Sequence, residues 1–139
     1  MKEILFRGKC NEIGKKCGQW IEGFYAKDDE KPLIAINKDN GLNGYFVDPS
    51  TVGQYTGLTD KNGKKIFDGD IIKIVPDYDY SDDYSISKVY SYNGIFCVDY
   101  HGDDFDSTAL GFLEDYLLDG DFEVIGNIHD NPELLEVKK

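Results

Sequence analysis

The sequence lacks most of the features that mark a membrane anchor or a catalytic site. No apolar run approaches the length of a membrane span, and no apolar signal segment opens the chain. It contains no Gly-rich phosphate loop and no Gly-x-Ser-x-Gly elbow, and its two histidines, His101 and His129, stand apart. We therefore expect a cytoplasmic protein that is not an enzyme of a class recognisable by motif.

Cysteine is scarce, with Cys10, Cys17 and Cys97 as its three occurrences. No Cys-x-x-Cys pair exists, and Cys10 and Cys17 are too far apart for a metal knuckle and have no histidine nearby. We expect three reduced thiols in a reducing compartment, with Cys97 in the core, and neither a bound metal nor a cofactor.

Basic residues are outnumbered, since 15 Lys and Arg stand against 27 Asp and Glu, for a net charge of −12. Residues 76–123 hold thirteen acids and one base, Lys88, so the rest of the chain balances at fourteen of each. Phosphate binding needs clustered Lys and Arg, so this segment argues against a direct nucleic-acid partner.

What the sequence does contain is typical of strands and turns. A length of 139 residues suits one domain, and 14% aromatic residues with 15 Gly favour β-structure over helix. The best-specified stretch runs from Asp48 to Ile74. There, Asn62-Gly63 predicts a hairpin with a type I′ turn, and Asp68-Gly69-Asp70 predicts a second turn before a strand over 71–75. We interpret Asp68 and Asp70 as turn caps, not as catalytic or metal-binding acids.

The remaining elements follow from alternation and turn signals. We predict an exposed loop over 27–32 and a helix at Thr108–Leu118, with a single helical turn near 132–136. The other predictions are strands at Lys2–Lys9, Trp20–Lys27 and Phe122–Ile128, and a hairpin of Leu33–Asn37 with Tyr45–Val47 across Lys38–Gly44. A further hairpin joins Ser85–Ser91 to Gly94–Tyr100 through the turn signal Tyr92-Asn93-Gly94.

Together these elements predict an all-β, mainly antiparallel fold. We expect a partly open Src-homology-3-like barrel with an N-terminal β lobe and one short helix near the C-terminus. The whole chain, 1–139, would form a single domain, in which 1–52 is the β lobe and 53–137 the barrel-like part.

Three segments also carry a family resemblance. Asp48-Pro-Ser-Thr-Val-Gly-Gln-Tyr-Thr-Gly-Leu-Thr-Asp-Lys-Asn-Gly-Lys-Lys-Ile-Phe-Asp-Gly-Asp-Ile-Ile72 resembles the signature of the YopX family of phage and prophage proteins. Ile4-Leu-Phe-Arg-Gly-Lys9 with Trp20-Ile-Glu-Gly-Phe24 is similar to the family's opening, and Glu123–Leu135 is similar to its closing segment. The resemblance implies a phage-type, mainly β protein inside the host cell and brings no catalytic residues with it.

Three hypotheses of function follow. The first is a non-enzymatic module that binds a protein partner or assembles with itself, with Trp20, Phe24 and Tyr25 as the candidate apolar surface. The second is an acidic decoy that occupies a nucleic-acid-binding protein through the candidate acidic surface Asp79, Asp82, Asp83, Asp103 and Asp104. The third is a metal-dependent enzyme built from Asp77, Asp79, Asp103 and Asp104.

The third hypothesis has a specific difficulty. Residues 77–88 begin like a calcium loop, but Asp82 stands where that loop needs Gly, and Lys88 stands where it needs a bidentate Glu. We expect a solvated acidic loop instead.

Overall fold

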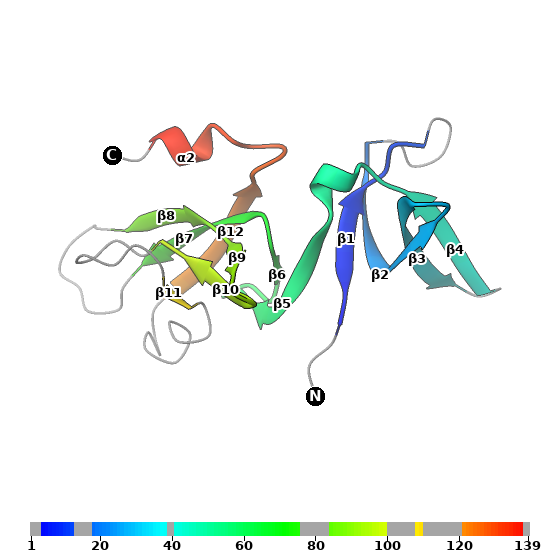
Figure 1. Cartoon of the computed structure of the whole chain (residues 1–139). Coiled ribbons are helices and arrows are strands. Elements are labelled where there is room, and N and C mark those ends of the chain that lie inside the picture. Colours follow the sequence, from blue (N-terminus) through cyan, green and yellow to red (C-terminus); the bar gives the residue numbers. More distant parts are fainter. Residues whose placement is uncertain are drawn as a thin grey trace. The chain divides into compact units, whose positions relative to one another are not determined.

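The computed structural model describes residues 4–12, 18–38, 41–75, 84–99, 108–109 and 121–137. These residues form an all-β, mainly antiparallel protein, as predicted (Figure 1). Its sheets do not close into a barrel. The chain divides into two compact units, Met1–Gly57 and Leu58–Lys139.

The elements follow one another as short strands with two single helical turns. In chain order they are β1 (Phe6–Lys9), β2 (Trp20–Asp28), β3 (Lys31–Lys38), β4 (Gly41–Phe46), η1 (Pro49–Thr51), β5 (Gly53–Thr59), β6 (Lys65–Phe67), β7 (Asp70–Val75), β8 (Ser85–Lys88), β9 (Tyr90–Tyr92), β10 (Ile95–Val98), β11 (Thr108–Ala109), β12 (Asp121–Asn127) and α2 (Leu134–Val137).

The first unit is built on a six-stranded sheet in the order β4-β3-β2-β1-β5-β6, of which it contains β4 to β1 and the beginning of β5. A single antiparallel bridge joins Cys10, after β1, to Val47, after β4, so the sheet bends back toward its own edge. This bend needs Gly8, because a Cβ there would lie 2.9 Å from Cβ of Val47. The core on the inner face consists of Cys10, Ile21, Ile34 and Val47, with Phe6, Ile36, Tyr45 and Val52 packed against it.

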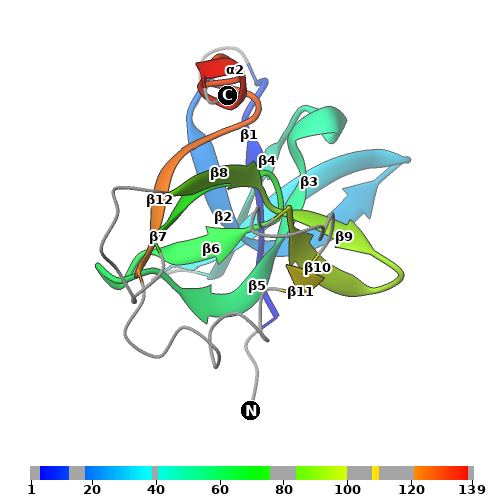
Figure 2. The same ribbon diagram turned by 90° about the vertical axis from the view of Figure 1, so that its left-hand side faces the viewer.

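The second unit contains two three-stranded sheets, in the orders β12-β7-β8 and β11-β10-β9 (Figure 2). The central strand β7 is Asp-Ile-Ile-Lys-Ile-Val, and its side chains Ile71, Ile72 and Ile74 are fully buried. The bulge between Val124 and Gly126 shifts the register of β12 on β7. The core joins Ile66, Ile72, Ile74, Val89, Val98 and Phe122.

The structure corrects the predicted helix over Thr108–Leu118 at its start. Thr108 and Ala109 form strand β11, where they pair with Val98 and Cys97 of β10. Cross-strand pairing therefore overrides the local helical pattern at these two residues. The rest of that prediction lies outside the described residues.

Hairpin connections also differ from the prediction. Ser85–Lys88 pairs with β7, and the hairpin partner of β10 is the short β9. The expected loop over 27–32 is a continuous hairpin with a two-residue turn at Asp29 and Glu30, whose φ angles are 57° and 69°. The expected loop Lys38–Gly44 is also shorter, because Gly41–Gly44 pairs with β3.

The type I′ turn at Asn62-Gly63 was predicted wrongly, although the hairpin is present. Gly63 has a φ of 83°, but Asn62 is not among the residues with positive φ. The Gly63 N–H donates to the Asp60 carbonyl oxygen, which makes a type I turn followed by a left-handed glycine. Both central residues have positive φ at Asn93-Gly94 instead, at 52° and 82°.

Candidate functional site

The predicted acidic surface lies outside the described residues. This holds for Asp79, Asp82, Asp83, Asp103 and Asp104, and for Asp77 of the metal hypothesis. Among the residues that the structure does describe, no three His, Cys, Asp or Glu side chains gather closely enough to hold a metal ion. Cys10 and Cys97 are free, buried thiols, and Cys17 is not described.

The predicted apolar surface is divided between the two faces of the first sheet. Trp20 and Phe24 share one face of β2, because side chains two residues apart along a strand point the same way. Tyr25 points to the opposite face, where its ring lies 5.3 Å from that of Phe6. The three residues therefore do not form one surface.

The register of the sheet shows which residues join Phe24. In antiparallel pairs, opposed residues lie on the same face, and Phe24 opposes Ala35, which opposes Gly44. We call this side, away from the buried Ile21 and Ile34, the outer face. Its apolar members are Trp20, Phe24, Leu33, Ala35, Leu42 and Phe46. Phe24 is 56% exposed and Leu42 is 68% exposed.

At one end of the outer face, Trp20 is covered by basic side chains. The Arg7 guanidinium lies 4.7 Å from the Trp20 ring centroid, and the Lys9 ammonium lies 5.9 Å from it. Such cation–π contacts hold the indole against its own sheet. Phe24 and Leu42 are the members of this face that present most of their apolar surface to solvent.

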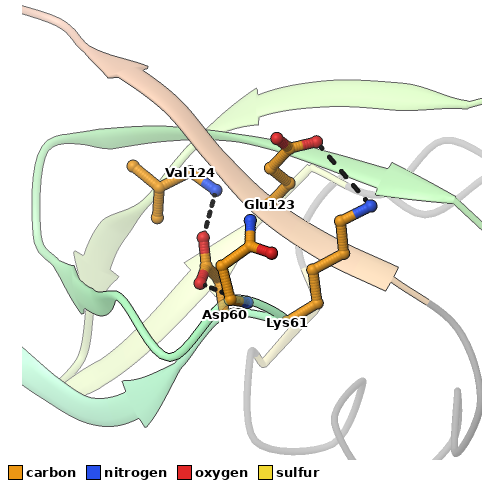
Figure 3. Close-up of polar contacts among 5 residues, drawn as sticks. Asp60, Lys61, Glu123 and Val124 are labelled. Carbon is orange, nitrogen blue, oxygen red and sulfur yellow. Dashed lines mark hydrogen bonds and ion pairs between the residues drawn. The ribbon is translucent and has the colours of Figure 1, made fainter.

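A second polar constellation surrounds Asp60, between β5 and β6. Its carboxylate accepts backbone N–H hydrogen bonds from Asn62, Lys64 and Val124, each 2.9 Å long. Figure 3 shows the bond from Val124. The neighbouring Lys61 N–H donates to the Phe122 carbonyl oxygen at 2.9 Å. The turn therefore occupies the free edge of β12.

The environment of Asp60 decides what its carboxylate can do. Burial of the group raises its pKa, but the hydrogen bonds from Val124, Lys64 and Asn62 and the charge of Lys64 outweigh this, and the net shift is downward. A carboxylate that stays ionised and is occupied by backbone donors makes a poor general base. Asp60 is a structural residue that joins the turn to β12.

The other polar contacts near turns are structural too. Asp70 is buried, and its carboxylate accepts the Phe67 N–H at 2.7 Å, which confirms its interpretation as a turn cap. Asn127 accepts the N–H groups of His129 and Asp130, both at 2.9 Å, so His129 belongs to a turn that leads to α2. These contacts give Asn127 a structural role within the closing segment Glu123–Leu135.

A depression of about 500 Å³ in the first unit combines charges of both signs. Its lining includes Glu12, Glu30, Lys31, Pro32 and Phe46. One Glu12 oxygen already accepts the Phe46 N–H at 3.2 Å. The depression contains neither histidine nor cysteine among its lining residues, so it offers no evident nucleophile–base pair.

Sequence reasoning missed the β4 members of the outer face. Leu42 fell within a predicted loop, because Gly41, Asn43 and Gly44 are poor strand formers. The usable signal was the spacing of Leu42 and Phe46, four residues apart, which places both apolar side chains on the same face of a strand. No helix of the described residues is long and apolar enough to cross a membrane.

The architecture defines a small all-β protein of open antiparallel sheets, and comparisons place it in a family. The family model described as "YopX protein" matches residues 5–136, so the chain belongs to the YopX family. It is 41% identical over 76 residues to the SPbeta prophage-derived uncharacterized protein YopX of Bacillus subtilis (strain 168). That match covers 53% of this chain and 52% of the relative, so it spans about half the relative's length.

Two solved structures share the fold over nearly the whole chain. The crystal structure of YopX from Bacillus subtilis aligns with a TM-score of 0.57 and 26% identity, covering 97% of this chain and 99% of the other. The crystal structure of EF1440 from Enterococcus faecalis aligns with a TM-score of 0.58 and 23% identity, with the same coverage. The prediction of the family is confirmed.

Proposed function

We propose that this protein is a non-enzymatic phage or prophage accessory protein that acts in the host cytoplasm by binding another protein. The observation that supports the proposal is the outer face of the first sheet, where Phe24 and Leu42 are 56% and 68% exposed. Exposed aromatic and aliphatic side chains grouped on one face are typical of protein–protein contacts.

The charge distribution also favours the first unit as the part of the chain that binds the partner. Residues 1–57 contain eight acids and eight bases, so the first unit is neutral while the net charge of −12 lies elsewhere. A unit without net charge exerts little long-range attraction on the phosphates of a nucleic acid or of an anionic membrane. Its exposed apolar face therefore suits a protein partner better than either of these.

The test is capture of partners from host lysate with the tagged full chain, followed by quantitative mass spectrometry. The variant Phe24→Ser/Leu42→Ser removes apolar area from the outer face. The matched control Tyr92→Ser/Ile95→Ser removes two side chains of similar exposure, 60% and 52%, from the β9–β10 hairpin.

We expect partner recovery to fall at least tenfold for the first variant and to stay unchanged for the control. Far-UV circular dichroism of each variant checks that the sheets are intact. Equal recovery by both variants would contradict the proposal, and so would a loss confined to the control.

A further inference from the structure

Strand β4 is an edge of its sheet. It pairs with β3 from Leu33 opposite Phe46 to Lys38 opposite Gly41, and no other strand lies along its far side in the described part of the first unit (Figure 1). Beyond its end, the bridge between Cys10 and Val47 covers the next backbone groups. The open portion is therefore short and well defined.

The hydrogen bonds of Phe46 show which backbone groups are available. Its N–H donates to Glu12 Oε1 at 3.2 Å and its carbonyl oxygen accepts the Asn11 N–H at 3.1 Å, so both groups point away from β3. Backbone direction alternates along a strand, so the groups of Gly44 and Leu42 point away from β3 as well. Both residues are exposed, and their outward N–H and C=O groups meet no partner among the described residues.

In the part of the chain that the structure describes, this edge has none of the usual protection against pairing. Proteins guard exposed edges with Lys, Pro, bulges or covering loops. β4 is Gly-Leu-Asn-Gly-Tyr-Phe, with neither charge nor proline, and its register on β3 is regular. An uncharged edge can approach an identical edge without repulsion.

We propose that β4 pairs antiparallel with β4 of a second copy, about a two-fold axis that passes between the two Asn43 residues. Leu42 would then oppose Gly44 of the second copy and exchange two backbone hydrogen bonds with it, and the symmetric pair would add two more. The exposed Leu42 side chain would lie beside a residue without a side chain. The inference deepens the proposed function, since it names a second copy as a partner of the same sheet.

The centre of the contact is also self-complementary. Asn43 would face Asn43 of the second copy in a non-hydrogen-bonded pair, with Cα atoms about 4.5 Å apart. Asn43 is exposed, and its amide offers both a donor and an acceptor, so two copies can satisfy each other. Glu12 occupies the Phe46 N–H and so ends the pairing there. Four backbone bonds predict a weak, concentration-dependent dimer.

The experiment measures the mass of the full chain by sedimentation equilibrium up to about 1 mM protein. Like charges directly opposite each other destabilise a strand pair, so Asn43→Lys and Asn43→Asp should each raise the dissociation constant at least tenfold. An equimolar mixture of the two variants should form a mixed dimer at least as tight as the wild-type dimer, because Lys then faces Asp. A wild-type chain that stays monomeric would overturn the inference.

Two further arms keep the result interpretable. Leu42→Pro removes an outward N–H and leaves the β3 ladder untouched, so it should weaken the dimer while circular dichroism stays unchanged. If the Asn43 variants associate as strongly as the wild type, the dimer contact does not lie at β4 and the inference is overturned. Phe24→Ser leaves the β4 backbone unaltered, so its effect on lysate capture tests the proposed function independently of the dimer.

Discussion

The two units treat their edge strands differently. In the second unit, the free edge of β12 is occupied by a turn, in which Asp60 accepts the Val124 N–H and Lys61 donates to Phe122. In the first unit, Glu12 accepts one β4 N–H, from Phe46, and the outward backbone groups of Leu42 and Gly44 meet no partner within the described ranges.

The occupied edge of β12 contributes to the stability of its own unit, whereas the edge β4 can take part in association with another chain. A carboxylate that satisfies three backbone donors joins distant parts of one unit and leaves nothing for a partner. An edge closed at one point only keeps a short template for another strand.

Replacing Asp60 with Ala should destabilise the second unit by about 3 kcal/mol, since three N–H groups lose a charged acceptor. Urea denaturation followed by circular dichroism measures the change. Lys61→Ala is the matched control, because its ion pair with Glu123 is 3.9 Å long and about 40% exposed, and it should cost less than about 0.5 kcal/mol. Equal effects of the two variants would show that Asp60 does not hold the edge.

Gly63→Val should destabilise the protein by about 1–2 kcal/mol, because a β-branched residue resists the φ of 83° at this turn. A Cβ at Gly63 would meet no atom within 4 Å, so the loss would come from the backbone alone. The control Gly63→Asn should cost less, because Asn tolerates the left-handed region. Thermal melting that is unchanged for Val would mean that the turn adopts another conformation in solution.

Substitutions in the β2–β3 turn should raise the free energy of unfolding by about 1 kcal/mol. Asp29 and Glu30 both have positive φ, and Asn-Gly is the preferred pair for such a two-residue turn. Asp29→Asn/Glu30→Gly should therefore raise the melting temperature. The same pair of changes at Asp28 and Lys31, which flank the turn within the strands, should lower it.

The Asp60 carboxylate also predicts a dependence on pH. Its folded pKa lies below the ordinary value of 3.8, so its ionised form stabilises the fold above that value and the stabilisation is lost as the pH falls through the folded pKa. The difference in urea midpoint between the wild type and Asp60→Asn should shrink from pH 7 toward the acid end of the titration. A difference that grows on acidification would contradict the assigned direction.

The acidic segment gives the smallest expected effect. If the outer face binds the partner, neutralising Asp79, Asp82, Asp83, Asp103 and Asp104 to Asn should leave lysate capture unchanged, also at half-molar salt. An acidic decoy would instead lose its basic partner in both conditions, because exposed charges are screened within about 8 Å at physiological salt. Such a loss would favour the decoy hypothesis over the proposed function.

Local sequence signals were sufficient where a turn depends on its own residues. Asn93-Gly94 forms its hairpin, and the β-branched run after Asp70 forms the central strand β7. They were insufficient where a distant group decides the conformation. The turn at Asn62-Gly63 is held by Asp60, which also bonds to Val124, 64 residues away in sequence.

The outer face illustrates a second limit. The predicted apolar surface combined Trp20, Phe24 and Tyr25, but alternation along β2 puts Tyr25 on the opposite face. The neighbours of Phe24 depend on strand register. Ala35 and Gly44 oppose each other because β3 pairs with β4, and the local sequence of either strand does not determine that pairing. Leu42 was not predicted to lie in a strand, because the glycines around it made the segment resemble a loop.

The contrast between the two edges can be measured most directly by hydrogen exchange of individual amides at low and high protein concentration. We expect the Val124 amide to be protected at both concentrations, because its N–H donates to the Asp60 carboxylate within the same chain. The Leu42 and Gly44 amides should exchange fast in dilute protein and at least tenfold more slowly in concentrated protein. Equal protection of Leu42 and Gly44 at both concentrations, or an unprotected Val124 amide, would contradict this contrast.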